Sequence, residues 1–476
     1  MSTSPFSAPD VAAVVLAAGR GTRFRSDLVK VLHRAAGRTL VRHVLEALRP
    51  LGLGQVVVVV GPDAHDVRAE IEDSGLPVHI AVQEQPLGTG HAVQQAVPVL
   101  DPGIRRVLVL PGDTPLLTGG VLAGLVEASD APSTLAMLTT RLADPSGYGR
   151  VLRSGDGTVA GIVEHADASD EQRAIDEVNA GMYVVPADTL ADALARLDDD
   201  NAQGEVYLTD VVALAVDAGC RVVAVDAPAD AVAGVNDRRQ LAEVSAVLRR
   251  RHLDHLMVDV GVTVVDPATT HVDVDVEVGV DSTLLPGTIL EAGTRIGRGC
   301  VVGPHTHLTR CVVGDGATVH STRGTDAVVG ASASVGPFAH LRAGTVLGAG
   351  GRIGAYVETK NARVGDGSKI PHLSYVGDAV IGSGVNVACG VVTVNYDGQD
   401  KHVTTIDDDA FVGCDTMLVA PVTIGAGAYV AAGSVITDDV PAGALAIARA
   451  RQVVKEGWVD RRRTRRSGDG DDEPPR

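Results

Sequence analysis

A glycine-rich segment near the amino terminus is the first part of the sequence where chemistry is expected. It reads LAAGRGTR at residues 16–23 and ends an apolar run that begins at Val11. Glycines let backbone N–H groups approach phosphate oxygens, and the two arginines and the nearby Lys30 add positive charge. No GK[ST] of a Walker loop follows, and Phe24 replaces the third glycine of a dinucleotide-binding GxGxxG motif. By itself the segment predicts either a phosphate-binding loop or a strand-to-helix turn with solvated arginines.

A lone carboxylate, Asp113, is the second candidate. It ends the sequence Pro111-Gly112-Asp113, which follows the apolar run Val107–Leu110. A carboxylate at the end of a buried strand can hold a divalent cation. In isolation such a residue is more often a helix N-cap or a turn residue. Asp113 alone therefore leaves both interpretations open.

Polar residues in the second half of the chain interrupt an aliphatic pattern. His372 is the candidate general base there, because the pKa of histidine lies near neutrality. A lone histidine is nevertheless more often structural or superficial. Arg342 and Lys360 are candidate phosphate-binding cations.

The elements that must position the first two candidates lie within residues 11–240. Apolar runs bounded by Gly, Pro and Asp predict buried parallel strands at Val11–Ala17, Val56–Val60 and Val107–Leu110. Amphipathic stretches such as Leu40–Leu48 and His91–Val99 lie between them. This alternation predicts an α/β, Rossmann-like domain with a doubly wound sheet, where ligands bind beyond the carboxyl ends of the strands.

After residue 258 the sequence repeats every six residues. An aliphatic residue recurs at this period, usually followed by a small or acidic residue. The pattern predicts a left-handed parallel β-helix, in which three short strands form one coil and the aliphatic side chains point inward. Breaks near 320–328, 359–363 and 393–405 predict loops that project from the coils, and Lys360 is expected in one of them. The repeating positions include Val278, Leu284, Leu290, Ile296, Val302, Leu308, Val329, Val335, Leu341, Leu347, Ile353, Val364, Ile370, Val376, Ile406, Val412, Leu418, Ile424, Val430 and Ile436.

Four segments are expected along the chain. They are the α/β domain at 1–238, a linker helix at 239–259, the β-helix at 260–458 and a disordered tail at 459–476. The linker is predicted because residues 236–257 are amphipathic and place Arg249–Arg251 late, as a helix dipole favours. The tail is charged and contains Gly and Pro.

Composition excludes several classes of function. The 476 residues carry a formal net charge of −19, which disfavours binding to nucleic acid or anionic membranes. Five scattered cysteines without a CxxC pair indicate neither a zinc finger nor a disulfide framework. With no long apolar segment and no signal peptide pattern, we expect a cytoplasmic protein.

The ordered motifs of the first domain resemble those of the sugar-1-phosphate nucleotidyltransferases. LAAGRGTR with Lys30 is similar to their entry motif, and the segment 83–92, with PLGTGHA, is similar to their uracil-recognising segment. Further matches are GYGR at 147–150, GIVE at 161–164, NAG at 179–181, GEVYLTD at 204–210 and GVN at 234–236. With the hexapeptide repeats, residues 11–458 resemble the bacterial bifunctional N-acetylglucosamine-1-phosphate uridylyltransferase/glucosamine-1-phosphate N-acetyltransferase family.

This resemblance implies a site for UTP and N-acetylglucosamine 1-phosphate in the first domain. Asp113 and Asn236 would hold Mg²⁺, and Lys30 would neutralise phosphate charge. Gly149, Glu164 and Asn179 would bind the sugar. The remaining residues implied for this site are Leu16, Ala17, Ala18, Gly19, Gln83, Gly88, Thr89 and Gly112.

The resemblance also implies an acetyl-transfer site in the β-helix. His372 would deprotonate the amino group of glucosamine 1-phosphate. The sugar phosphate would bind Arg342, Lys360, Tyr375 and Asn386, and acetyl-CoA would bind Cys389, Asn395, Tyr396, Cys414, Ala432 and Arg449. Cys414 and Cys389 depart from the family, which often has Ser and a small Ala-like residue there. Both are small, and we expect them to line the cleft rather than to form an acyl intermediate. They would make this site sensitive to thiol reagents.

Assembly is expected to follow the family pattern of a homotrimer, with the acetyl site between subunits, which also protects exposed strand edges. An alternative is a single-activity nucleotidyltransferase whose β-helix only mediates oligomerisation. A non-catalytic sugar-nucleotide-binding protein is disfavoured, because Lys30, Asp113 and Asn236 occur together.

Overall fold

The computed structural model describes residues 6–19 and 21–466. It divides into two compact units: Met1–Asp259 with His271–Val276, and Val260–Thr270 with Glu277–Arg476. The predicted linker helix belongs to the first unit. None of the helices within the described ranges combines the length and apolar character needed to cross a membrane.

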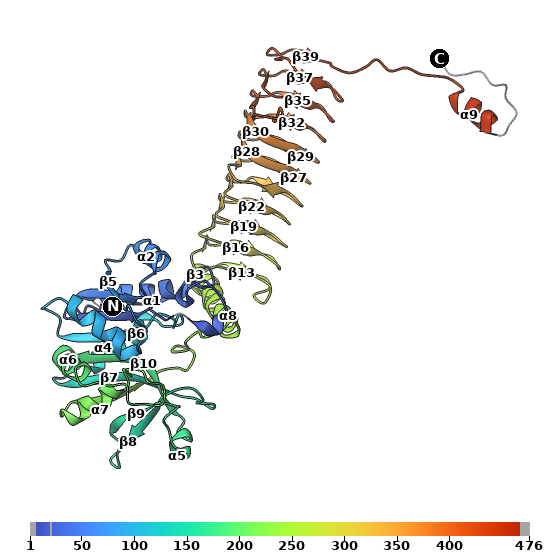
Figure 1. The fold of residues 1–476 in the computed structure, drawn as a ribbon. Coiled ribbons are helices and arrows are strands. Elements are labelled where there is room, and N and C mark those ends of the chain that lie inside the picture. Colours follow the sequence, from blue (N-terminus) through green and yellow to red (C-terminus); the bar gives the residue numbers. More distant parts are fainter. Residues whose placement is uncertain (1–5, 20, 467–476) are drawn as a thin grey trace. The chain divides into compact units, whose positions relative to one another are not determined.

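A mixed β-sheet forms the centre of the first unit, with the strand order β11-β7-β10-β6-β1-β4-β5 (Figure 1). Its paired strands are parallel except for β10, which runs antiparallel to both β6 and β7. A hairpin of β8 (Arg150–Arg153) and β9 (Val159–Val163) extends from β10. The sheet strands are β1 (Val11–Leu16), β4 (Gln55–Val60), β5 (His79–Val82), β6 (Arg106–Pro111), β7 (Thr134–Arg141), β10 (Glu177–Pro186) and β11 (Arg221–Asp226).

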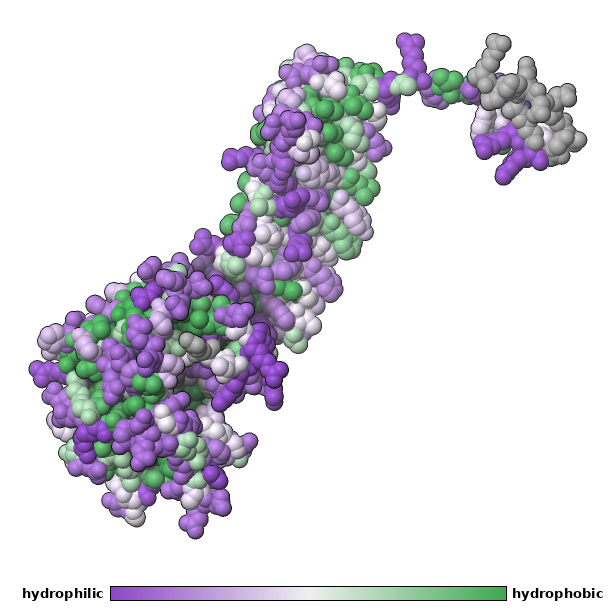
Figure 2. All heavy atoms as spheres, viewed as in Figure 1, coloured by the Kyte–Doolittle hydropathy of each residue, from purple (hydrophilic) through white to green (hydrophobic). Residues whose placement is uncertain are grey.

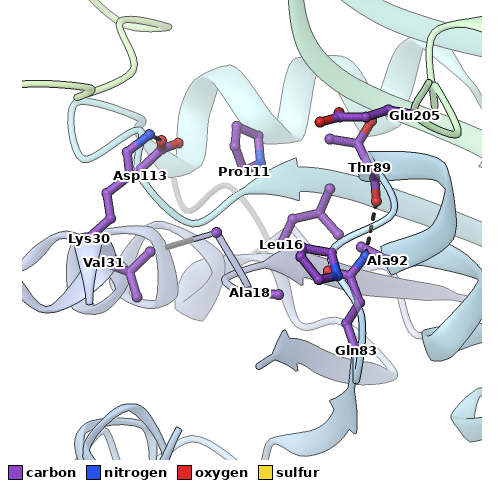
Figure 3. Close-up of a pocket in the computed structure, with 13 residues that line it drawn as sticks. Leu16, Ala18, Lys30, Val31, Gln83, Thr89, Ala92, Pro111, Asp113 and Glu205 are labelled. Carbon is purple, nitrogen blue, oxygen red and sulfur yellow. Dashed lines mark hydrogen bonds and ion pairs between the residues drawn. The ribbon is translucent and has the colours of Figure 1, made fainter. Parts of the chain in front are cut away.

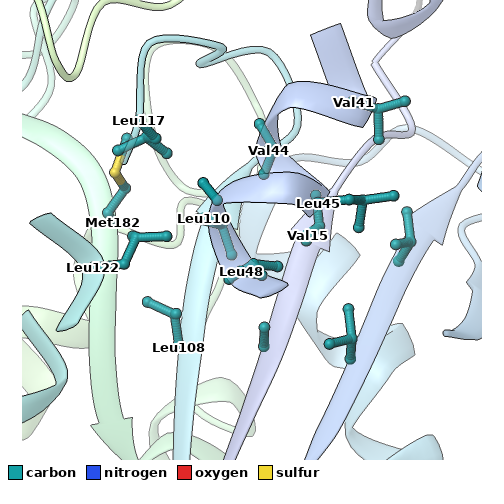
Figure 4. Packing of buried hydrophobic residues seen from close by; sticks show 14 of the residues in the cluster. Val15, Val41, Val44, Leu45, Leu48, Leu108, Leu110, Leu117, Leu122 and Met182 are labelled. Carbon is teal, nitrogen blue, oxygen red and sulfur yellow. The ribbon is translucent and has the colours of Figure 1, made fainter. Parts of the chain in front are cut away.

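Apolar side chains on both faces of this sheet form separate hydrophobic clusters. Val15 and Leu110 pack on one face with α1 (Leu40–Leu48) and α4 (Gly119–Ala128), as Figure 4 shows. Val14 and Val109 belong to the cluster on the other face, which includes residues of α3 (Thr89–Ala96), α6 (Ala187–Leu194) and α7 (Asp210–Asp217). Helices on both faces confirm the predicted α/β fold, although the sequence did not indicate the antiparallel β10.

The strand order creates a crevice at the carboxyl end of β1. The chain passes from β1 to β4 on one side and later returns to β6 on the other. Such a reversal separates the loops that follow β1 and β6, which leaves room for a ligand. Ala17–Gly19 and Asp113 follow these two strands, so both candidates lie at this edge.

Helix α8 (Arg238–His255) follows the α/β domain and is capped by Asp237, whose side chain accepts from Arg239 N and Gln240 N. Val244 and Leu248 of α8 are buried against Phe24 and Leu40. A π-helical turn, Leu256–Val260, follows α8.

Parallel sheets of short strands form the second unit, whose coils stack on one another (Figure 1). One sheet has the order β12-β15-β18-β21-β24-β27-β29-β31-β34-β37-β39. These strands are β12 (Thr263–Val264), β15 (Thr283–Leu284), β18 (Val301–Val302), β21 (Thr318–Val319), β24 (Ser334–Val335), β27 (Arg352–Ala355), β29 (Lys369–His372), β31 (Asn386–Val387), β34 (Phe411–Val412), β37 (Tyr429–Val430) and β39 (Leu445–Ala446). Its inward residues pair in register from coil to coil, as Leu284 with Val302 and Ile353 with Ile370, and they are buried. The predicted hexapeptide β-helix, of the left-handed kind, is therefore confirmed.

Two of the three predicted loops are wrong. Residues 359–363 lie within the continuous strand β28 (Glu358–Val364), so Lys360 is on a strand, and 320–328 contains β22 (Arg323–Thr325). The aliphatic pattern fails there because Thr359 and Gly324 take the inward positions, where both are buried. The third loop is present between β32 (Val392–Val394) and β33 (Thr404–Ile406).

The carboxyl-terminal segment also differs from the expectation of disorder. A helix, α9 (Trp458–Arg466), occupies its first part, and the Arg462 guanidinium stacks over the Trp458 ring at 5.0 Å. Residues 467–476 lie outside the described residues.

Candidate functional site

A cavity of about 280 Å³ opens at the carboxyl ends of β1 and β6 (Figure 3). It brings together most of the residues predicted to bind the nucleotide. A second cavity of about 370 Å³ shares Ala18, Gly19 and Gln83 with it and is also lined by Ala17. The predicted residues that line the first cavity are Leu16, Ala18, Gly19, Lys30, Gln83, Gly88, Thr89 and Asp113.

The Lys30 side chain joins the two predicted metal ligands. Its ammonium group forms an ion pair with Asp113 and donates a hydrogen bond of 2.8 Å to Asn236 Oδ1. Figure 3 shows Lys30 and Asp113 directed toward each other. A carboxylate and an amide oxygen are hard ligands suited to Mg²⁺, and a cation already lies against both of them. Among the residues that the structure describes, no group of three or more His, Cys, Asp or Glu side chains is arranged to hold a metal, so further ligands would come from substrate phosphates and water.

Gln83 is held in one orientation at the base of the cavity. Its amide nitrogen lies 3.0 Å from Gly88 O and 3.1 Å from His91 Nδ1. Because a carbonyl oxygen only accepts, the NH₂ group must face Gly88, which leaves the amide oxygen of Gln83 as an acceptor for a ligand. Sequence reasoning did not identify His91 as a partner of Gln83.

Gly88 is required by its backbone conformation and its neighbour. Its φ is 118°, and a Cβ there would lie 2.5 Å from Val206 O. The carbonyl of Val206 in turn accepts from Gly90 N at 2.8 Å. Gly112 is similarly crowded, because a Cβ would lie 3.0 Å from Leu16 O, between β1 and β6.

The three predicted sugar-binding residues form a second group. Asn179 N donates to Gly149 O at 2.9 Å, and a Cβ on Gly149 would lie 3.4 Å from Glu164 Oε1. Glu164 accepts from Thr209 Oγ1 at 3.1 Å. Burial, with the nearby Asp210 and Asp167 carboxylates, raises the pKa of Glu164 despite this bond. Asn179 donates to the Tyr183 hydroxyl at 2.6 Å, which fixes its amide.

In the second unit, His372 lies in one column with three predicted acetyl-CoA residues. His372 ends β29 (Lys369–His372), and the pairing of Lys369 with Asn386 places it beside Cys389 on the next coil. Asn386 pairs with Phe411, and Phe411 with Tyr429, which extends the column to Cys414 and Ala432. Backbone hydrogen bonds join the successive coils along this column: Gly390 N donates to His372 O, Asp415 N to Cys389 O and Gly433 N to Cys414 O.

Cationic side chains gather on the neighbouring sheet, on the two coils that precede that of His372 and on the loop after β32. Arg342 donates to Glu358 Oε1 at 2.8 Å, and Lys360 follows two residues after Glu358 on β28. The adjacent Lys401 ammonium lowers the pKa of Lys360, while the Asp378 carboxylate acts in the opposite direction. Sequence reasoning missed Lys401, which the loop after β32 brings to this cluster.

The other predicted residues of this unit are distributed around the column and the cations. Tyr375 begins β30 (Tyr375–Ile381), and Asn395 follows β32 and is buried. Tyr396 is exposed and its hydroxyl donates to Gly398 O at 2.7 Å. Arg449 donates to Ala432 O at 2.9 Å, which places it beside the end of the column.

Comparisons with known proteins cover both units. Residues 13–257 match the model of the MobA-like NTP transferase domain, and residues 404–438 match that of the bacterial transferase hexapeptide (six repeats). A protein of Mycolicibacterium gilvum named bifunctional protein GlmU is 52% identical over 461 residues, covering 95% of this chain and 92% of the relative. The protein of the same name from Corynebacterium glutamicum is 50% identical over 469 residues, covering 97% and 96%. That of Mycolicibacterium smegmatis is 48% identical over 463 residues, covering 95% of each.

Proposed function

The chain belongs to the family of bifunctional GlmU proteins, and from this membership we propose that it catalyses two successive steps of UDP-N-acetylglucosamine synthesis. The β-helix acetylates glucosamine 1-phosphate, and the α/β domain transfers UMP from UTP to N-acetylglucosamine 1-phosphate, releasing pyrophosphate. The observation that carries this proposal is identity of about half over 95% of the chain, which includes both units.

In the uridylyl-transfer site, the side chains act mainly by positioning. The phosphate oxygen of N-acetylglucosamine 1-phosphate attacks the α-phosphorus of UTP in line, and pyrophosphate leaves. Backbone groups of Leu16, Ala17, Ala18, Gly19 and Gly112 contact the nucleotide, and Lys30 moves from Asn236 to its phosphates. Asp113 and Asn236 would hold Mg²⁺, which when bound supplies charge stabilisation to the phosphates.

The residues around Gln83 select the base, and the residues around Glu164 select the sugar. The Gln83 amide oxygen accepts from the uracil N3–H, because its NH₂ group is occupied by Gly88 O. Gly88 and Thr89 place the backbone beside the base. Gly149, Glu164 and Asn179 bind the sugar, since they contact one another and present a carboxylate and an amide.

In the acetyl-transfer site, His372 accepts a proton from the 2-amino group of glucosamine 1-phosphate. The neutral amine then attacks the thioester carbonyl and forms the C–N bond. As the tetrahedral adduct collapses, the C–S bond breaks and the departing sulfur takes up the proton that the new amide nitrogen loses, so that coenzyme A leaves as the thiol. Arg342 and Lys360 bind the sugar phosphate, with Tyr375 and Asn386 beside the sugar. Acetyl-CoA lies along Cys389, Asn395, Tyr396, Cys414, Ala432 and Arg449.

We further propose that the protein acts as a homotrimer in the cytoplasm, where UTP and acetyl-CoA are available. Part of one outward column of the β-helix is apolar: Val312, Val328 and Val346 lie in register and are 37–44% exposed, and Arg363 follows them in the column. Figure 2 shows that hydrophobic residues reach the surface along this unit. Packing of these columns between subunits would bury them.

Two separate assays test the proposal. The purified protein is given UTP, Mg²⁺ and N-acetylglucosamine 1-phosphate while pyrophosphate is followed, and separately acetyl-CoA and glucosamine 1-phosphate while free thiol is followed. We expect activity in both. Uridylyl transfer without acetyl transfer would instead support a nucleotidyltransferase with a non-catalytic β-helix.

A further inference from the structure

A buried carboxylate, Asp378, lies beside the proposed acetyl-transfer residues without a function assigned to it. It occupies a corner within β30, where its φ is 48°, and it is 7% exposed. A carboxylate removed from water is costly unless its oxygens are bonded. Its partners therefore indicate what it contributes.

Both oxygens of Asp378 accept hydrogen bonds from amides on the adjacent coils. Oδ1 accepts from Asn361 Nδ2 at 2.8 Å, and Oδ2 accepts from Asn395 Nδ2 at 2.5 Å. The pairing of β28 with β30 places Asn361 opposite Asp378. An ionised carboxylate only accepts, so both amides must turn their NH₂ groups toward it. Asp378 thus determines which face of the Asn395 amide remains for a ligand.

The Asn395 amide also lies close to the Tyr375 hydroxyl. Both approach the same point above Gly377, where a Cβ would lie 2.4 Å from Tyr375 Oη and 2.9 Å from Asn395 Nδ2. Glycine at 377 therefore leaves space that these two side chains fill. Because Asp378 follows Gly377 directly, one short segment organises both groups.

The charges around Asp378 keep it ionised. Burial acts to raise its pKa, but the bonds from Asn361 and Asn395 and the ammonium groups of Lys360 and Lys401 lower it overall. Asp378 in turn opposes the lowering of the Lys360 pKa by Lys401. The carboxylate thus partly offsets the repulsion between two like charges in the cluster proposed to bind the sugar phosphate.

We propose that Asp378 is a positioning residue for acetyl transfer, which orients the Asn395 amide and, next to it, the Tyr375 hydroxyl toward the acetyl thioester and the amino sugar. This proposal rests on the proposed acetyltransferase function. Asp378 itself does not touch the reacting atoms, and its contribution passes through Asn395.

A double-mutant cycle tests this contribution in the full-length protein. Asp378→Asn replaces one oxygen by an NH₂ group, so one of the two neighbouring amides loses its acceptor. We expect acetyl-transfer kcat to fall about tenfold or more, with a smaller change in the KM for acetyl-CoA. In an Asn395→Ala background, the same substitution is expected to cost less than about twofold, because its target has been removed.

Asp366→Asn is the matched control. Asp366 is also an aspartate of the β-helix, but its Oδ1 accepts from a backbone group, Ala349 N, at 2.7 Å. We expect acetyl transfer near the unsubstituted rate. Uridylyl transfer and the thermal midpoint of each variant show whether it folds, and Asp378→Ser replaces Asp378→Asn if the latter does not.

Two results would overturn the proposal. One is an equal loss of acetyl-transfer kcat from Asp378→Asn in the unsubstituted protein and in the Asn395→Ala background. The other is no loss of kcat in either background. Absence of acetyl transfer in the unsubstituted protein is a different outcome, because it would remove the acetyltransferase function on which the proposal rests.

Discussion

The ammonium nitrogen of Lys30 lies 2.8 Å from Oδ1 of Asn236, although 206 residues separate them in the chain. The same ammonium contacts the Asp113 carboxylate, and the Lys30 side chain is only 14% exposed. Gly21 packs against the stem of Lys30, since a Cβ there would lie 2.6 Å from Lys30 Cβ. A divalent cation that uses Asp113 and Asn236 must therefore displace Lys30, and the phosphates of UTP offer the displaced ammonium a new partner.

Lys30→Met should uncover this cation site in the absence of nucleotide. We expect the variant to bind free Mn²⁺ at least about tenfold more tightly than the unsubstituted protein, because a buried positive charge no longer competes. Electron paramagnetic resonance of free Mn²⁺ measures this without any turnover. Adding Asp113→Asn to Lys30→Met should abolish the gain. Equal Mn²⁺ binding by the variant and the unsubstituted protein would show that Lys30 does not compete.

His372→Ala should separate the two activities. His372 is exposed at the end of β29, so its removal leaves the core intact. We expect acetyl transfer to fall by about 10²–10⁴, as for loss of a general base, and uridylyl transfer to be unchanged. Parallel loss of both activities would point to a folding defect.

Alkylation should act on the acetyl site through Cys414 and Cys389. Cys414 is exposed and Cys389 is half-buried, whereas Cys220, Cys300 and Cys311 are buried. Burial also raises the pKa of Cys300 and Cys311, which lowers their thiolate fraction. We expect iodoacetamide to reduce acetyl transfer and to spare uridylyl transfer.

The control for this alkylation is the double variant Cys389→Ala/Cys414→Ser, which should keep its acetyl transfer after the same treatment. Mass spectrometry identifies the modified thiols. Full acetyl transfer after modification of both cysteines would contradict their placement along the coenzyme A groove.

Glu164→Gln should stabilise the protein at neutral pH while weakening sugar binding. The pKa of Glu164 is raised in the folded state, mainly by burial, so ionisation disfavours folding. Its contribution to stability is present below the ordinary pKa of glutamate and is lost as the pH rises through the raised value. The variant should therefore have the higher thermal midpoint at pH 7, and the difference should vanish in acid. Thermal melts across pH measure this, and a constant difference at all pH values would contradict it.

The sequence predicted regular elements better than irregular contacts. Val11–Leu16, Leu40–Leu48 and the inward column that includes Ile353 and Ile370 follow simple periodicities, and the structure has them. Thr359 and Gly324 could not be predicted as inward residues, because neither is aliphatic and only the coils above and below show that they are enclosed.

The candidate sites show the same contrast, because their motifs could be predicted from the sequence and their contacts between distant segments could not. The spacing of the motifs indicated Asp113 and Lys30 as site residues. It could not show that Lys30 contacts Asn236, because Asn236 lies in a distant segment of the chain. His91 and Lys401 escaped notice because their importance lies in tertiary contacts, to Gln83 and beside Lys360. We expected a disordered tail and so did not predict α9, because composition alone does not detect a short helix rich in arginine.

Along the column from His372 through Cys389 and Cys414 to Ala432, successive residues are separated by one regular distance. Each step is one strand spacing, so the column spans about 14 Å in three equal increments. For the extended arm of a ligand bound along this column, the distance from His372 to each contact is therefore a whole number of coils. Insertion of a coil between Cys414 and Ala432 would therefore shift the distant end of that arm by a full increment while the reacting end stayed in place.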